Sequence, residues 1–349
     1  MKTRARLGMV ALPLLTGFGV GVGKRAVTAS QASPTAARTP QVFVFSNSSP
    51  HVSVIDAGSL AVVQTADIPE FTAWTWNDDN NHAGESELWL GTRNPDTNDV
   101  EVITLDLETL AVTHRIPIGQ DDMTLYIGKA TKEGILNIGK MGAGQVVAID
   151  TATYQVLDTW DVPVNGDVVC DADVTTDGQG RELFVYPTRD GDTVVTIDAA
   201  TGETVQEIAS PSGSRPLMLT TGGDGTVWVQ ESGSNTNAVY DPELTLLDRF
   251  PTGQGPIVNT FSPDGALSYI GYGGDTVVTV IDTETYEEVA TVQAGTNPQK
   301  IAVNPDGQAI YAILTDEASV AVIDTTTWEV TERVMLGTNP NGIFFRAAS

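Results

Sequence analysis

Residues 320–324 read Val-Ala-Val-Ile-Asp, and similar five-residue stretches ending in aspartate occur seven times along the chain. The final aspartates lie roughly 41 to 50 residues apart, at Asp56, Asp106, Asp150, Asp198, Asp241, Asp282 and Asp324. A repeat of this length, built from short alternating strands and turn residues, is typical of a β-propeller. We therefore predict an all-β, seven-bladed β-propeller whose blades are four-stranded antiparallel sheets.

One repeat illustrates the expected blade. Residues 256–261, 267–271, 277–281 and 288–292 alternate between apolar and polar side chains, and Gly, Pro and Asp separate them. This pattern indicates four short strands. The propeller is expected to span residues 41–346, beginning with the second strand of a blade and ending with the first. Those two terminal strands should pair and close the ring, which removes the exposed edges of an open sheet.

Six of the seven repeated aspartates are followed three positions later by Ser or Thr, and Asp241 is the exception. An aspartate at the end of a strand accepts backbone N–H groups across the following turn. We interpret this ring of carboxylates as turn-stabilising residues rather than as catalytic acids.

The last repeats carry a family resemblance. The stretches Gly-Thr-Asn-Pro at 295–298, Ile-Ala-Val-Asn-Pro-Asp-Gly at 301–307 and Val-Ala-Val-Ile-Asp at 320–324 resemble the YVTN family of β-propeller repeats. That family is similar to the heavy chain of quinoprotein amine dehydrogenase and to bacterial surface-layer propellers. The resemblance covers about residues 41–346 and implies the fold.

The N-terminal 29 residues read as a signal peptide. Lys2, Arg4 and Arg6 precede an apolar, glycine-rich stretch at residues 7–23, and small residues follow. This order is typical of a secretory signal, with an N-terminal membrane anchor as the alternative. Residues 30–40 are expected to form a flexible leader. We predict an exported protein in the periplasm, at the cell surface or outside the cell.

The net charge of the chain limits the classes of partner that it can bind. The chain contains 45 acidic and 18 basic residues, a net charge of −27, and without residues 1–29 the charge would be about −32. Such a chain repels nucleic acid and anionic lipid. We expect no nucleic-acid partner, no membrane insertion of the mature chain, and a monomer. The single cysteine, Cys170, excludes an intramolecular disulfide.

Candidate binding residues precede the first strand of several blades, where propellers present the mouth of their central channel. Acidic side chains there could bind a cation and an arginine could bind an anion. The alternative is that the asparagines, which precede prolines, are turn residues. The predicted set is Asp121, Asp122, Asp167, Arg215, Gln254, Asn297 and Asn339.

Metal and redox chemistry find little support in the sequence. His51, His82 and His114 are expected on a loop, another loop and an outer strand, so a shared histidine site is disfavoured. The chain lacks a Cys-x-x-Cys-His motif for covalent haem. The second repeat is longer than the others. Its residues 94–99 resemble the start of a calcium loop, but the loop lacks the glycine at its sixth position and has Leu105 where the closing glutamate would be needed. Trp74 and Trp76 are interpreted as packing residues, with a sugar-stacking surface as the alternative.

These observations favour a non-catalytic module that binds an unknown protein or small molecule at the channel mouth, without a cofactor. Two alternatives remain. One is an enzyme or redox-partner subunit resembling amine dehydrogenase heavy chains or propeller lactonases. The other is a metal-binding exported propeller.

Overall fold

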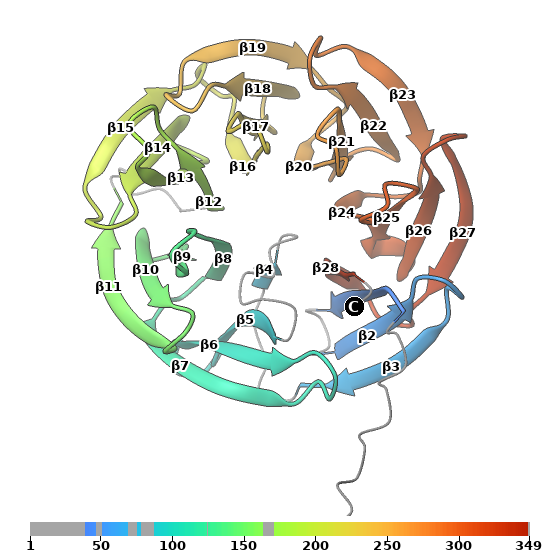
Figure 1. Cartoon of the computed structure of the whole chain (residues 1–349), viewed down its shortest axis with the longest axis horizontal. Helices are drawn as coiled ribbons and strands as arrows, with labels where there is room; N and C mark the ends of the chain where they lie inside the picture. Colours follow the sequence, from blue (N-terminus) through green and yellow to red (C-terminus); the bar gives the residue numbers. More distant parts are fainter. Residues whose placement is uncertain are drawn as a thin grey trace, which may run out of the picture. The chain divides into compact units, whose positions relative to one another are not determined.

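The computed structural model describes residues 39–46, 51–68, 75–77, 87–123, 125–162 and 171–347. Residues 38–349 form one compact unit, and the seven sheets of this unit are arranged around a common axis (Figure 1). The predicted seven-bladed β-propeller is confirmed. No helix in the described ranges is long and apolar enough to cross a membrane.

The strands fall into four concentric sets. The innermost strands are β4 (Thr75–Asn77), β8 (Leu125–Ala130), β12 (Asp173–Thr176), β16 (Pro216–Thr221), β20 (Pro256–Phe261), β24 (Pro298–Val303) and β28 (Pro340–Arg346). The second strands are β1 (Gln41–Ser46), β5 (Glu87–Arg93), β9 (Ile135–Lys140), β13 (Glu182–Thr188), β17 (Val227–Glu231), β21 (Leu267–Tyr272) and β25 (Ala309–Leu314).

The third strands end at the repeated aspartates or, in one blade, one residue before: β2 (His51–Asp56), β6 (Asp99–Asp106), β10 (Gln145–Asp150), β14 (Thr193–Asp198), β18 (Thr236–Tyr240), β22 (Val277–Asp282) and β26 (Ser319–Asp324). The outermost strands are β3 (Val62–Asp67), β7 (Val112–Gln120), β11 (Gln155–Asp161), β15 (Thr204–Ala209), β19 (Leu246–Pro251), β23 (Glu288–Gln293) and β27 (Glu329–Met335). A 3-10 turn, η1 (Thr315–Glu317), connects β25 to β26.

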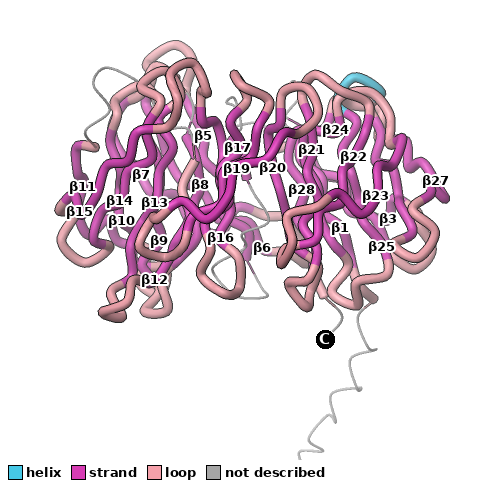
Figure 2. Tube along the Cα trace, turned by 90° about the horizontal axis from the view of Figure 1, so that it is seen from above, coloured by secondary structure: helices cyan, strands magenta, loops and turns pink. Residues whose placement is uncertain are grey.

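Two layers of loops flank the strands (Figure 2). We call the side that carries η1 and the loops preceding the innermost strands the upper face. The lower face carries the turns that join the innermost strands to the second strands and the third strands to the outermost ones. Burial follows the concentric order, because β22 is buried along most of its length whereas β23 is mostly exposed.

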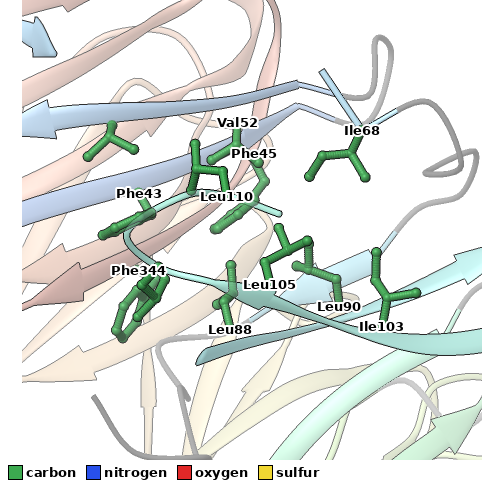
Figure 3. Close-up of a cluster of buried hydrophobic side chains, with 12 residues drawn as sticks. Phe43, Phe45, Val52, Ile68, Leu88, Leu90, Ile103, Leu105, Leu110 and Phe344 are labelled. Atoms are coloured by element: carbon green, nitrogen blue, oxygen red, sulfur yellow. The ribbon is translucent and has the colours of Figure 1, made fainter. Parts of the chain in front are cut away.

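The ring closes as predicted, through antiparallel pairing of β1 with β28, in which Phe43 lies opposite Phe344. Their ring centroids are 5.9 Å apart, and both side chains belong to a cluster that fills the seam between the first and second blades (Figure 3). Apolar clusters of this kind recur between neighbouring blades, because each blade buries its faces only against the next one.

The second blade differs locally from the expected pattern. Its sheet has the order β5-β6-β7, and β4 pairs in parallel with β8 of the third blade, Thr75 lying opposite Leu125. The sequence predicted that β4 would pair within its own blade. The irregularity falls in the repeat whose length departs most from the others.

Candidate functional site

The predicted binding residues occupy the loops of the upper face that precede the innermost strands, as expected. Asp121 and Asp122 precede β8, and the other described residues of the set each precede a different innermost strand. Asp167 lies outside the described residues. Within the described ranges, no hydrogen bond or ion pair joins two members of the set, so their role in binding stays a prediction.

Asp121 stabilises the loops of its own blade. Its side chain is 4% exposed, and its carboxylate accepts the backbone N–H groups of Met123 at 2.7 Å, Gly142 at 3.1 Å and Ala143 at 2.9 Å. A Cβ atom at Gly142 would lie 2.8 Å from Asp121 Oδ1, so glycine is required for this approach. The carboxylate is thus engaged by three donors of the protein itself, whereas Asp122 is exposed.

The other members are also held by neighbouring loops. Arg215 pairs with Asp190 at 3.0 Å, with both side chains about half exposed, and the Asn297 amide donates to the Asp316 carboxylate. Both Arg215 and Asn297 adopt a left-handed backbone, with φ of 50° and 51°. The backbone N–H of Gln254 and the backbone carbonyl of Asn339 are hydrogen-bonded as well.

A second set of side chains, which sequence reasoning missed, follows the proline that begins four of the innermost strands. In four consecutive blades the pairing register shifts immediately after the proline that begins the innermost strand. A β-bulge re-aims the side chain of the extra residue. The four bulged residues are Leu217, Ile257, Gln299 and Asn341. The repeated Pro-x step at the start of each strand was the available signal.

Below the bulges lies a level of residues defined by strand pairing. Tyr126, Met218, Val258 and Lys300 each pair with the residue eleven positions before the repeated aspartate of their blade. They therefore occupy equivalent heights on the innermost strands. The side chains at this height belong to four different blades but share one level of the ring.

Two of these side chains meet on the inner side of the ring. The Lys300 ammonium lies 3.6 Å from the Met218 sulfur. Because β20 stands between β16 and β24, this contact can form only in front of β20, toward the axis (Figure 1). Met218 also forms a buried cluster with Tyr126 and Met141, against which Leu217 and Ile257 pack.

The opposite side of this cluster is polar. Lys300 is 2% exposed, and the neighbouring strand contributes Asn341, which is 6% exposed. The Asn341 side-chain oxygen has no hydrogen-bond partner within the described ranges. A buried amide oxygen without a partner is costly and is rare in native proteins. At the upper end of the axis, one side of the ring is therefore apolar, and the other side carries a lysine and an amide.

A lower group of charges on the inner strands has a structural role. The Lys129 ammonium pairs with Asp173 at 2.6 Å, and Asp173 also accepts the backbone N–H of Thr221 at 2.7 Å. Asp171 likewise accepts the N–H of Leu219 at 3.0 Å. These carboxylates satisfy N–H groups on the unpaired inner edge of β16, which has no further strand beside it.

Lysines are distributed unusually in this acidic chain. Of the four lysines that the structure describes, Lys140 and Lys300 are buried and Lys129 is 26% exposed at its side chain. Lys132 is the one lysine of this group that is exposed. Lysine is normally found at the surface, so its concentration on the inner two strands needs a reason beyond solubility.

The structure assembles no histidine or metal site within the described residues. His51 begins β2 rather than lying in the preceding loop, a correction to the sequence-based expectation, and its ring pairs with Asp67 at 2.8 Å. His114 lies on the outer strand β7, as expected, and stacks on Tyr154. His82, Trp74 and Cys170 fall outside the described residues.

The loop at residues 94–99 borders a cavity of about 510 Å3. Asp99, Glu101 and Arg115 are among its lining residues. Thr97 and Gln120 hydrogen-bond Asp99, which lowers the pKa of its carboxyl group, and Glu101 pairs with Arg115 at 3.0 Å. Calcium binding at this loop stays an alternative to a solvated loop.

Known propellers share the fold at low sequence identity. No family model and no curated protein matches the chain. A candidate 6-phosphogluconolactonase from Bacteroides fragilis is 13% identical, with 90% of this chain and 99% of that chain aligned and a TM-score of 0.68. A protein of unknown function from Desulfotomaculum acetoxidans is 16% identical over 88% and 99%, with a TM-score of 0.71. A streptogramin B lyase is 18% identical over 80% and 89%, with a TM-score of 0.62. These similarities establish the propeller fold.

Proposed function

We propose that this propeller is a non-catalytic, exported binding module that captures a small organic anion with an apolar body at the upper end of its axis. The observation that carries the proposal is the contact between Lys300 and Met218 on the inner side of the ring. The ammonium group would bind the anionic group of the ligand. The cluster of Tyr126, Met141 and Met218 would bind its apolar part.

Lys300 is a buried lysine. Removing an ammonium group from water is unfavourable unless other groups compensate its charge. A cation at this position is useful where it attracts an anion. The amides of Gln299 on β24 and of Asn341 on the neighbouring strand β28 would add donors and acceptors.

The test compares Lys300→Met with Lys132→Met, which removes the same charge from the exposed lysine on the lower face. Binding of 8-anilinonaphthalene-1-sulfonate and of octanoate is measured by fluorescence and by calorimetry. We expect Lys300→Met to weaken binding at least tenfold. Lys132→Met should bind as the parent does.

Equal affinities of the parent and of Lys300→Met, or absence of binding by the parent, would contradict the proposal. A second candidate function is lactone hydrolysis, favoured by the similarity to a candidate 6-phosphogluconolactonase. A pH-stat assay on a sugar lactone tests it, because hydrolysis releases an acid and base would then have to be added to hold the pH in the presence of the parent chain.

Two further proposals concern origin and export. The repeat stretches support membership in the YVTN family, and the basic and apolar N-terminus supports a signal peptide at residues 1–29 followed by a leader. Mass spectrometry of the protein recovered from the periplasm or the medium would test export. A mature mass that retains residues 1–29 would favour the membrane-anchor alternative.

A further inference from the structure

Two adjoining cavities lie between blades on the lower face, at the opposite end of the strands from the upper face. The first, of about 380 Å3, is bordered by Asp224, Trp228, Phe261 and Asp264. The second, of about 300 Å3, is bordered by Asp264, Asp306, Tyr269 and Trp328. The turn at Ser262, Pro263 and Asp264 borders both cavities and separates them.

Each cavity combines an aromatic wall with carboxylates at its rim. In the first, Trp228 and Phe261 meet edge to face with ring centroids 5.6 Å apart. In the second, Tyr269 and Trp328 lie 6.3 Å apart at a tilt of 55°. Aromatic faces beside carboxylates attract organic cations through cation–π and Coulomb interactions together. Neither cavity has a lysine or arginine among its described lining residues.

Tyr269 contributes a neutral polar group to the second cavity. Its side chain is 1% exposed and borders that cavity. Burial and the nearby charge of Asp264 raise the pKa of Tyr269 to about 12, so the hydroxyl is neutral and can accept a hydrogen bond from a cationic donor.

We propose that these two cavities form a docking site for an extended basic segment of a partner protein, whose arginine or lysine side chains enter the seams on either side of the 262–264 turn. Charge complementarity favours this occupant, because three turn carboxylates border the cavities in a chain of net charge −27. Two pockets that share one wall suit a linear segment with alternating cationic side chains better than a single compact ion.

The experiment uses the whole chain and a fluorescently labelled peptide of sequence Arg-Gly-Arg-Gly-Arg, with binding followed by fluorescence anisotropy. We expect Asp264→Asn to weaken binding about five- to tenfold, because Asp264 borders both cavities. Trp328→Leu, which removes no charge, should weaken it about threefold or more. A peptide with glutamine in place of arginine should not bind.

Glu207→Gln is the matched control, since it removes one negative charge from the exposed outer strand β15. Its affinity for the peptide should stay within twofold of the parent. If Glu207→Gln weakens binding as much as Asp264→Asn, or if Trp328→Leu binds as the parent does, the attraction is a general effect of net charge and the docking site is wrong. Spermidine binding as tightly as the peptide would also overturn the proposed occupant.

Discussion

At the scale of single residues, the repeated aspartates are accounted for by their turns. The Asp282 carboxylate accepts the N–H groups of Glu284 at 3.0 Å and Thr285 at 2.8 Å and also the Thr285 hydroxyl at 3.0 Å. Asp56, Asp106, Asp150, Asp198 and Asp324 each likewise accept the backbone N–H of the residue three positions later. Asp241, the exception in the sequence, accepts instead from the N–H of Thr245 at 2.7 Å. The interpretation of these residues as turn-stabilising is confirmed.

Asp282→Ala should therefore destabilise the chain in a manner that depends on pH. The Thr285 N–H group, followed by its hydroxyl, lowers the pKa of Asp282. A depressed pKa in the folded state stabilises the protein above the pKa of the unfolded state, and this contribution is lost as the pH falls through the folded value. We expect the thermal midpoint of Asp282→Ala to lie roughly 2 °C below that of the parent at neutral pH.

This difference should shrink as the pH is lowered from about 5 to about 2, because the carboxylate of the parent becomes protonated. Scanning calorimetry across that range measures it. Glu284→Ala, which removes an exposed carboxylate from the same turn, is the control and should match the parent throughout. A difference that stays constant with pH would show that the Asp282 charge does not stabilise the turn.

At the scale of elements, two features shape the ring: the pairing of its terminal strands and the β-bulges of the innermost strands. The pairing of β1 with β28 joins residues about 300 positions apart. Arg346, 4% exposed at the end of β28, also pairs with Glu108 of the second blade at 2.8 Å. The closing strand thus contacts two blades. Bulges at the upper ends of four innermost strands re-aim the side chain that follows the proline, as at Gln299 on β24 and Asn341 on β28.

Phe43→Ala should test how much the closure stabilises the fold. Phe43 is fully buried against Phe344 and the cluster between the first two blades. Loss of a buried phenylalanine side chain leaves a cavity and lowers the free energy of unfolding by about 3 to 5 kcal/mol. Equilibrium urea unfolding measures this change. Val63→Ala, on the outer strand β3 where Val63 is 54% exposed, should change the free energy by less than about 0.5 kcal/mol.

At the scale of the whole molecule, the acidic charge is the dominant property. Arginine side chains mainly form ion pairs with nearby carboxylates, such as Arg249 with Glu231 at 2.8 Å. The described lysines lie mostly near the inner strands. The excess of carboxylates is left on the surface and in the turns. Mutual repulsion of these charges opposes the compact state.

Salt should therefore stabilise the protein. Raising NaCl from about 0.1 M to about 1 M shortens the Debye length from about 10 Å to about 3 Å, which screens the repulsion. We expect the thermal midpoint to rise over this range at pH 7, as measured by circular dichroism. The rise should be smaller near the isoelectric pH of about 4.1, where the net charge vanishes. A midpoint that is independent of salt at pH 7 would contradict this explanation.

The sequence by itself determined the number of blades, the closure of the ring and the role of the repeated aspartates. These features depend on local alternation and on turn chemistry, which the periodic spacing makes visible. For the sixth blade the expected strand at 256–261 coincides with β20, and the other three strands differ by one residue at one end.

Tertiary structure decided which polar residues come together. Asp121 and Arg215 stand where the repeat predicted them, yet their side chains contact neighbouring loops rather than each other, because each blade holds its own loop. Lys300 and Met218 are 82 residues apart and meet only because the ring brings β16 and β24 around the same axis. The seams between blades leave no periodic signal, since they depend on how one blade packs against the next.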